Sequence, residues 1–321
     1  MSRILDIFNG DADGLCALHQ LRMAEPLESS LVTGPKREIS LLRRITPQAG
    51  DRITVLDVAL SKNRAGVDMA LAVGASVRYF DHHQPGNLPQ HPAFEAHIDT
   101  SPETCTSLLV NEYLGGRYRI WAVTAAFGDN LAQSARLAAK PLNLNESQLS
   151  NLRELGECLN YNGYGETLDD LHFSPDQLYR IVHQYRDPFE FIASEPAFTI
   201  LKNGLAEDLG QVENLQAVEE RVGGRVYVLP AQKWARRISG LFGNRLAEAS
   251  PAQAHAVLTR KTEGGFVVSV RAPMQNKFGA DEICSKFETG GGRKGAAGIN
   301  HLPEADYSRF VSTFFSLYAP T

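Results

Sequence analysis

The sequence predicts an α/β protein with two domains. The first would be an N-terminal parallel sheet with helices on both faces, followed by a helical connector and a smaller C-terminal α/β domain with a mixed sheet. Two observations support this. Short apolar runs alternate with helix-like stretches through the first half, which is the pattern of βαβ units. The 321 residues, 43% of them hydrophobic, are also enough for two domains that each bury a core.

The predicted strands of the first domain are five short apolar runs. They cover residues 4–8, 31–33, 53–58, 77–80 and 97–98. Helix-like segments lie between them, for example at 15–24 and 65–73. Strands that alternate with helices at this spacing favour parallel pairing, because each return to the sheet needs a crossover connection.

The second half changes character twice. Residues 141–222 are rich in Leu, Asn, Gln, Glu and Arg and are predicted to be mostly helical. The later segments predict a strand at 226–229, a helix at 238–249, a hairpin of 256–262 with 266–271, a helix at 281–287, a glycine-rich loop, a strand at 297–299 and a helix at 305–317. We therefore expect domains at 1–192 and 225–321, joined by a connector at 193–224.

Composition limits the classes of function. The net charge of −5 weighs against binding to long duplex DNA, because counterion release by basic residues supplies most of that affinity. The four cysteines are scattered without zinc-site spacing. The sequence shows neither the apolar core of a secretory signal nor a membrane span, so we expect a cytoplasmic protein without membrane partners.

Acidic and histidine residues follow several predicted strands. They are Asp11 and Asp13 after the first strand, Asp57 near the end of the third, and Asp81, His82 and His83 after the fourth. Ligands of open parallel sheets bind at the carboxyl ends of the strands, so these side chains should converge. Each residue alone has an ordinary alternative as a helix cap or a hydrogen-bonded histidine. Their combination at one sheet edge favours a metal site.

The residue types also indicate the metal. Clustered carboxylates repel one another unless cations neutralise them. Oxygen ligands combined with imidazole favour Mn²⁺, Fe²⁺ or Co²⁺ over Ca²⁺. Two such ions about 3.5 to 4 Å apart would polarise a phosphoryl group and activate a water molecule. We expect two Mn²⁺ ions, with Mg²⁺ or Co²⁺ as alternatives.

With these residues in place, the chain resembles the DHH phosphoesterase superfamily. The resemblance is to the branch with a DHH-associated C-terminal domain, which includes RecJ-like exonucleases and nanoRNases. The matching segments are FNGDADGLCA, TVLDVAL, YFDHHQPG and AAFGDN, with HIDTSPETCTSLLV between the third and the fourth. They occur in the family's order over nearly the whole chain.

The resemblance implies a role for each matching residue. Asp11 would bind the first ion, Asp13 the second, and Asp57 both. His82 and Asp129 would complete the ligands of the second ion. Asp81 would orient the histidines, and His83 would contact the scissile phosphate or assist the leaving group. Many members carry His where this chain has Ile7, so the chain follows the RecJ-like version. Asn9 stands in place of a first acidic residue; the alternatives are a weak ligand and only a turn former, and a role as a ligand or as a support to one is favoured.

The C-terminal domain carries the implied substrate-binding residues. VVSVRAP resembles a strand whose arginine, here Arg271, contacts phosphate. GGGRKGAAG resembles a glycine-rich substrate loop, and Arg293 replaces the histidine usual in the family. Gly290, Gly291 and Gly292 would allow close approach of a phosphate, and arginine can bind it bidentately. Lys294 adds a second cation.

The favoured function is hydrolysis of short oligonucleotides or dinucleotides, such as pGpG, to mononucleotides. The alternatives are a RecJ-like single-strand exonuclease, a hydrolase of cyclic dinucleotides or small phosphoesters, and a non-catalytic nucleotide-binding regulator. Two basic clusters bear on the exonuclease: Lys36, Arg37, Arg43 and Arg44, and then Lys233, Arg236 and Arg237 beside Trp234. They could line a cationic groove, but solvated helix faces are the preferred interpretation. A homodimer is left open.

Overall fold

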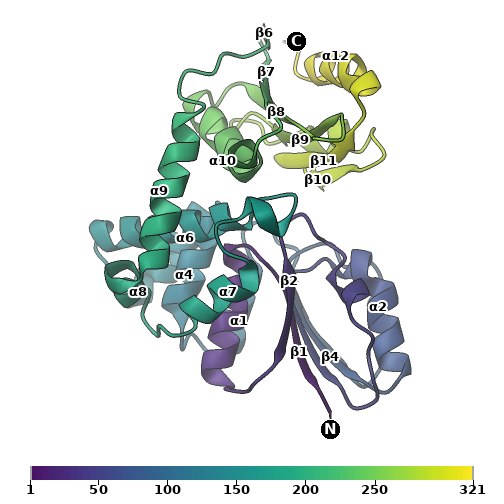
Figure 1. Ribbon diagram of the computed structural model, residues 1–321, viewed down its shortest axis with the longest axis vertical. Helices are drawn as coiled ribbons and strands as arrows, with labels where there is room; N and C mark the ends of the chain where they lie inside the picture. Colours follow the sequence, from purple (N-terminus) through teal and green to yellow (C-terminus); the bar gives the residue numbers. More distant parts are fainter. Residues whose placement is uncertain (1, 320–321) are drawn as a thin grey trace. The chain divides into compact units, whose positions relative to one another are not determined.

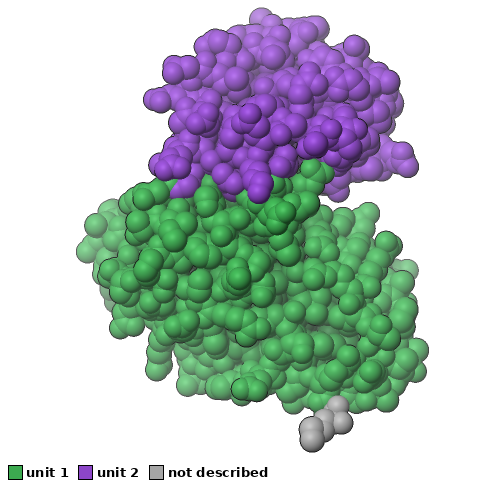
Figure 2. All heavy atoms as spheres, in the orientation of Figure 1, with its two compact units in different colours: residues 1–203 green, residues 204–321 purple. Residues whose placement is uncertain are grey.

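Figure 2 shows the two compact units of the computed structural model, which divide between Asn203 and Gly204. The structure describes residues 2–319. The division falls within helix α9 (Pro196–Gly210). The limits of the proposed catalytic domain, connector and substrate-binding domain remain predictions.

Unit 1 is built on a five-stranded parallel sheet in the order β2-β1-β3-β4-β5. Its strands are β1 (Ile4–Asn9), β2 (Ser30–Gly34), β3 (Arg52–Leu56), β4 (Ser76–Asp81) and β5 (Phe94–Ile98). The predicted fold class is confirmed, although the third strand ends two residues before the predicted limit. The strand order reverses between β1 and β3, which is the position where open α/β sheets bind ligands.

Helices cover both faces of this sheet. They are α1 (Ala12–Ala24), α2 (Leu60–Ala72), α3 (Thr106–Tyr113), α4 (Arg119–Gly128), α5 (Ala132–Ala139), α6 (Glu146–Gly163), α7 (Pro175–Val182) and α8 (Pro188–Ser194). Figure 1 shows α2 on one side of the strands, and α1 with α4, α6 and α7 on the other. Every residue of α1 from Ala12 to Arg22 is buried, as expected of a helix enclosed by a sheet and by other helices.

Two apolar layers hold the sheet. On the α2 face, Ile7, Val55, Val77 and Tyr79 pack against Leu60 and its neighbours on α2. The alternate side chains Phe8, Leu56 and Phe80 are fully buried on the opposite face. Such burial of both faces is typical of parallel sheets, whose strands read as nearly continuous apolar runs.

Unit 2 contains a six-stranded sheet in the order β10-β11-β9-β8-β7-β6. The sheet is mixed, as predicted. Its strands are β6 (Glu219–Arg221), β7 (Gly224–Leu229), β8 (Ala254–Arg260), β9 (Phe266–Arg271), β10 (Gly290–Arg293) and β11 (Ala296–Leu302). Of these pairs only β7 with β8 is parallel. The helices are α10 (Lys233–Ala249), α11 (Ala280–Cys284) and α12 (Tyr307–Leu317).

Residues 219–221, at the end of the segment predicted to be mostly helical, form β6 against β7. Two local predictions for this half were wrong. The predicted glycine-rich loop is the edge strand β10, because its backbone pairs with β11 from Gly290 to Arg293. The helix expected at 281–287 ends at Cys284. Glycines in sequence favour a loop, but ladder hydrogen bonds to a neighbouring strand override that local preference.

Two further observations concern the described residues of both units. All four cysteines are buried and none forms a disulfide. Among residues 2–319, no helix is both long and apolar enough to cross a membrane.

Candidate metal centre

The register of three adjacent strands sets three polar side chains in one row. Phe8 pairs with Leu56, and Leu56 pairs with Phe80. The residues that follow are Asn9, Asp57 and Asp81, so they stand at the same level at the carboxyl edge of the sheet. Two of them, Asp57 and Asp81, are at most 2% exposed. The sheet itself therefore collects the acidic residues that are distant in sequence.

The NGDADG segment turns from β1 directly into α1. Asp11 caps the helix, and its Oδ1 accepts hydrogen bonds from the amides of Asp13 and Gly14 at 3.0 and 3.1 Å. Gly14 is required here, because a Cβ at that position would lie 2.2 Å from the carbonyl oxygen of Asn9. The cap uses one carboxylate oxygen of Asp11 and leaves Oδ2 for the site.

Asp13 lies in the first turn of α1 and faces the start of α3. Its Oδ1 accepts from the Ser107 amide at 2.7 Å and its Oδ2 from the Thr106 amide at 2.8 Å. The N-terminus of a helix favours a negative charge. This contact explains the position of the HIDTSPETCTSLLV segment, which brings α3 to the acidic cluster.

Asp57 follows β3 in the left-handed region, with φ of 58°. Only a few per cent of non-glycine residues adopt such a φ, at a cost on the order of 1 kcal/mol or more. The Asp57 amide donates to the Phe80 carbonyl at 3.0 Å, which fixes this turn. Strain of this kind is concentrated at functional sites.

The DHH sequence orients both imidazole rings. Asp81 Oδ1 accepts from the His82 amide at 2.9 Å and lies 2.7 Å from Nδ1 of His83. His82 Nδ1 lies 3.1 Å from the carbonyl oxygen of Thr104. Because a carbonyl oxygen can only accept, Nδ1 of His82 is the donor in this contact, and Nε2 is the ring nitrogen left to face the site.

Nε2 of His82 faces a carboxylate. His82 Nε2 is 3.3 Å from Oδ1 of Asp57, and His83 Nδ1 is 3.9 Å from the same oxygen. Donor atoms from Asp57, His82 and His83 all lie within 4.8 Å of one another. Two ligands bound by one ion at about 2.1 Å stand about 3.0 to 3.4 Å apart. The Asp57–His82 pair thus has the spacing and the donor types of metal ligands.

Three buried oxygens of the cluster have no hydrogen-bond partner within residues 2–319. They are Oδ1 of Asn9, Oδ2 of Asp81 and Oδ2 of Asp129. Asp129 follows the last residue of α4 and lies 3.5 Å through Oδ1 from the ammonium group of Lys36. Buried acceptors of this kind are costly unless a cation or water satisfies them. They add to the case that the cluster fits divalent ions.

Lys36 is the residue that the sequence analysis missed as part of this site. Its Nζ lies 2.5 Å from Oδ2 of Asp11. Lys36 lies in an irregular segment after β2. The preferred interpretation, a solvated helix face, was therefore wrong for this residue. The strand order could have suggested its place, because β2 is the neighbour of β1.

The pKa values reflect crowding of like charges in a buried place. Burial, followed by the charges of Asp11 and Asp13, raises the pKa of Asp57 well above its usual value. Burial would also raise the pKa of Asp11, but the charge of Lys36 and its hydrogen bond lower it. Burial favours the neutral amine of Lys36, yet the charge of Asp11 keeps its pKa well above the ordinary value. Lys36 is therefore a cation.

The predicted substrate-binding residues of unit 2 occupy two settings. Arg271 is held by its own unit: Nε donates to Asn244 at 2.6 Å, Nη1 to Ser269 at 2.9 Å and Nη2 to the Gly240 carbonyl at 3.2 Å. Arg293 and Lys294 are exposed at the turn between β10 and β11. Of the strand glycines, a Cβ at Gly290 would lie 1.8 Å from the Cys284 carbonyl oxygen and one at Gly292 2.5 Å from Ala297, whereas Gly291 meets no atom within 4 Å.

The other predicted cationic residues are partly engaged in ion pairs. Arg237 on α10 forms two contacts with Asp208, at 2.7 and 2.9 Å. Arg44 lies 3.4 Å from Glu38 and donates to the Thr33 carbonyl at 2.6 Å. These pairs reduce the charge available for a nucleic-acid groove.

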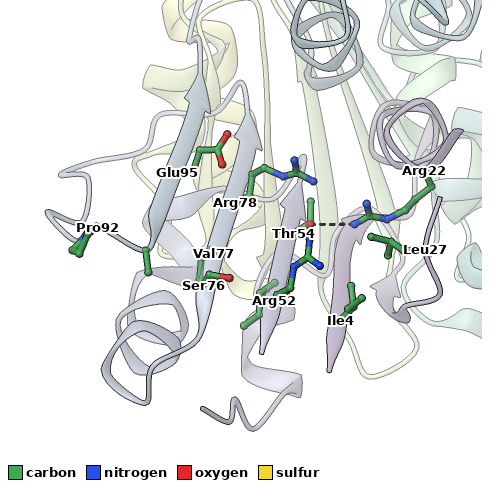
Figure 3. Close-up of a pocket in the computed structure, with 12 residues that line it drawn as sticks. Ile4, Arg22, Leu27, Arg52, Thr54, Ser76, Val77, Arg78, Pro92 and Glu95 are labelled. Atoms are coloured by element: carbon green, nitrogen blue, oxygen red, sulfur yellow. Dashed lines mark hydrogen bonds between the residues drawn. The ribbon is translucent and has the colours of Figure 1, made fainter. Parts of the chain in front are cut away.

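A hollow of about 280 Å³ lies at the opposite, amino end of the strands (Figure 3). Arg22, Arg52 and Arg78 line it. Two of these already have carboxylate partners: Arg22 with Asp6 and Arg78 with Glu25. We therefore place the chemistry at the acidic carboxyl edge, where Asp57 and Asp81 have no lysine or arginine partner within the described residues, and not in this hollow.

The chain was compared with known proteins. No protein-family model matches the sequence, and no curated protein matches it. Three solved structures are similar in fold: the DHH domain of a member of a family of ribosomal proteins, the exonuclease RecJ bound to manganese, and the pGpG-specific phosphodiesterase PggH from Vibrio cholerae.

The likeness covers nearly the whole chain at low identity. The TM-scores are 0.68, 0.64 and 0.55, with 14%, 18% and 13% identity, in that order. The alignments span 98%, 99% and 99% of this chain and 86%, 90% and 99% of the other chains. The resemblance stated from the motifs is confirmed at the level of architecture: this chain has the fold of DHH-domain proteins.

Proposed function

We propose that the chain is a metal-dependent phosphodiesterase that hydrolyses short oligonucleotides or dinucleotides, such as pGpG, to mononucleotides. The observation that carries the proposal is Nε2 of His82, which lies 3.3 Å from the buried carboxylate of Asp57, a residue in the left-handed backbone region. An imidazole nitrogen and a carboxylate oxygen at this spacing are donor types that one divalent ion can bind. Phosphoesters are the substrates that such Asp and His clusters commonly serve.

The family resemblance supports two groups of ligands. Asp57, His82, Asp13 and Asp129 would hold one divalent ion, and Asp11, Asp57 and Asn9 would hold another. Bound ions would neutralise the phosphate oxygens and lower the pKa of an attacking water molecule. Asp81 fixes the ring of His83 through Nδ1, at 2.7 Å. The chain itself thus sets the geometry before substrate arrives.

His83 is suited to move a proton. Burial lowers its pKa, but the hydrogen bond and the charge of Asp81 raise it above the ordinary value. Its side chain is 44% exposed, unlike that of Asp57 at 3%. With Nδ1 engaged by Asp81, Nε2 is the atom left to contact the scissile phosphate and to donate a proton to the leaving oxygen.

Short substrates are favoured over long strands by charge. The net charge is −5, and Arg237 and Arg44 already have acidic partners. These pairs reduce the charge of the two basic clusters that could follow a long phosphate backbone, which needs many cations. Arg293 and Lys294, exposed on the β10–β11 turn, are the proposed anchors for the small substrate in unit 2, with Arg271 and the glycines 290–292 supporting them.

The test is a digest of oligonucleotides of graded length, including pGpG and a cyclic dinucleotide, with Mn²⁺. We expect dimers to be cleaved fastest and cleavage to disappear in Asp57→Asn. Asp68→Asn is the matched control, because it makes the same change on the exposed surface of α2. Equal cleavage of long strands would favour the exonuclease alternative, and no cleavage of any phosphoester would favour the regulator.

A further inference from the structure

Lys36 occupies a built position inside the acidic cluster. Its Nζ lies 2.5 Å from Asp11 Oδ2, 3.5 Å from Asp129 Oδ1 and 3.5 Å from the Asn160 side-chain oxygen. Its ammonium group stands 5.4 Å from the centre of the Tyr164 ring. The contacts come from the start of α1, the end of α4 and the end of α6, so three elements define this place.

The backbone around Lys36 is fixed as well. Its amide donates to the Gly163 carbonyl at 2.8 Å. Gly163 ends α6, and a Cβ there would lie 2.8 Å from Cα of Asp11. The end of α6 is therefore packed directly on the capping turn of α1. Lys36 is held from both its backbone and its ammonium group, unlike a surface lysine that turns inward by chance.

The two sides of the site differ in the negative charge they offer to a metal. On the Lys36 side, Asn9 is neutral, and Asp11 Oδ1 is used by two backbone amides. The remaining oxygen, Asp11 Oδ2, is in contact with Lys36. On the other side, Asp57 meets imidazole nitrogens and no lysine or arginine within the described residues. Of the ligands proposed there, Asp129 lies 3.5 Å from Lys36, farther than the 2.5 Å that separates Lys36 from Asp11. A divalent ion would meet less attraction, and a competing cation, on the Lys36 side.

We propose that the Lys36 ammonium is a built-in monovalent cation that takes the place of one divalent ion. The chain then binds one divalent ion strongly, at Asp57 and His82, and a second only when Lys36 withdraws from Asp11. The inference rests on the proposed function, because both place a divalent ion at this edge of the sheet. In the substrate complex, the ammonium would neutralise phosphate charge as a compact hydrogen-bond donor.

The test measures metal binding and requires no activity. Chelator-treated wild type, Lys36→Met and Lys36→Arg are titrated with Mn²⁺ by calorimetry, and electron paramagnetic resonance reports exchange-coupled ion pairs. We expect one strong Mn²⁺ in wild type and Lys36→Arg. A second should bind on the order of 100-fold more weakly, since a charge-assisted hydrogen bond must break first. Lys36→Met should bind two ions strongly and give a coupled spectrum.

Controls separate the outcomes. Lys62→Met removes an exposed lysine on α2 and should behave as wild type. Two strong ions in both wild type and Lys36→Met would overturn the Lys36 proposal and leave the proposed function standing. Absence of any Mn²⁺ binding, in wild type as in Asp57→Asn, would overturn both. If Lys36→Met does not fold, Lys36→Gln replaces it; two strong ions there support the proposal, and one ion contradicts it.

Discussion

The two ends of the parallel sheet in unit 1 both carry buried charge, and they treat it in opposite ways. At the amino end, Arg22 contacts Asp6 at 2.7 and 2.5 Å, and Arg78 contacts Glu25 at 2.7 Å. At the carboxyl end, Lys36 pairs with Asp11, but Asp57 and Asp81 meet only histidines among the ion pairs of residues 2–319. The ion pairs at the amino end stabilise the fold, whereas Asp57 and Asp81 at the carboxyl end lie close together without a lysine or arginine partner within the described residues.

This difference separates a structural cluster from a candidate site. Buried ion pairs with good geometry offset their desolvation, whereas unpaired buried carboxylates have raised pKa values and cost stability. The pKa of Glu25 is lowered, first by the hydrogen bond from Arg78, and that of Asp57 is raised by burial and by its acidic neighbours. Proteins keep such conflicts where function requires them. Mutations at the two ends should therefore affect different properties.

The largest expected effect is on activity, from Asp57→Asn at the carboxyl end. Loss of this carboxylate removes a proposed ligand worth several kcal/mol, so kcat/KM should fall about 1,000-fold. Asparagine tolerates the left-handed φ of 58°, so the backbone should keep its conformation. Steady-state hydrolysis of a dinucleotide with Mn²⁺ measures the loss.

The same variant tests stability in the opposite direction. In chelator at neutral pH, Asp57→Asn should unfold at the same temperature as wild type or higher, because it removes a buried charge near Asp11 and Asp13. A clear fall in the unfolding temperature, with activity per folded molecule retained, would make Asp57 a structural residue and remove the contrast between the two ends.

Next in size is a change in stability at the amino end, from Arg22→Met. Arg22 is 3% exposed, and its partner Asp6 also accepts from Ser29 at 2.6 Å. Removing one member of a buried pair typically costs about 3 to 5 kcal/mol, because the other charge stays buried. Urea unfolding should show this loss, with activity per folded molecule unchanged. A loss below about 1 kcal/mol, the scale of an exposed pair, would contradict the assignment.

The sequence allowed prediction of whatever depends on local pattern and strand order. Alternating apolar and helical segments give the parallel sheet, and the rule that ligands bind at its carboxyl edge brings Asp11, Asp57 and Asp81 together. The tautomer of His82 was beyond the sequence, because it depends on the carbonyl of Thr104, 22 residues away. The left-handed turn at Asp57 was also not foreseeable from its neighbours.

Lys36 and β10 show why the remainder could not be predicted. Lys36 lies in a charged stretch typical of a solvated surface, and only the packing of β2 and α6 directs its side chain toward Asp11. The glycines 290–292 predict a loop by local preference, and pairing with β11 makes them a strand. In both cases, contacts between segments distant in sequence outweigh the local signal.

A smaller effect on activity is expected from Asp81→Asn. Oδ1 of Asp81 accepts from the backbone amide of His82 and contacts Nδ1 of His83, so Asp81 acts by positioning the two histidines. Loss of such support typically lowers activity or metal affinity about 10- to 100-fold. The pH profile should shift too, because Asp81 raises the pKa of His83. An unchanged pH profile, even with lower activity, would contradict this positioning role.

The smallest expected effect is on the pH dependence of the unfolding free energy, from the Glu25–Arg78 pair at the amino end. Arg78 lowers the pKa of Glu25, so the folded protein binds fewer protons there than the unfolded chain. This contribution is present above the unfolded pKa of about 4.3 and is lost as pH falls through the folded value. Since Glu25 is 34% exposed, we expect less than about 1 kcal/mol. In Arg78→Met, the unfolding free energy should fall less steeply as the pH is lowered through this range. An identical pH dependence in the variant and in wild type would show that this pair adds nothing to stability at the amino end.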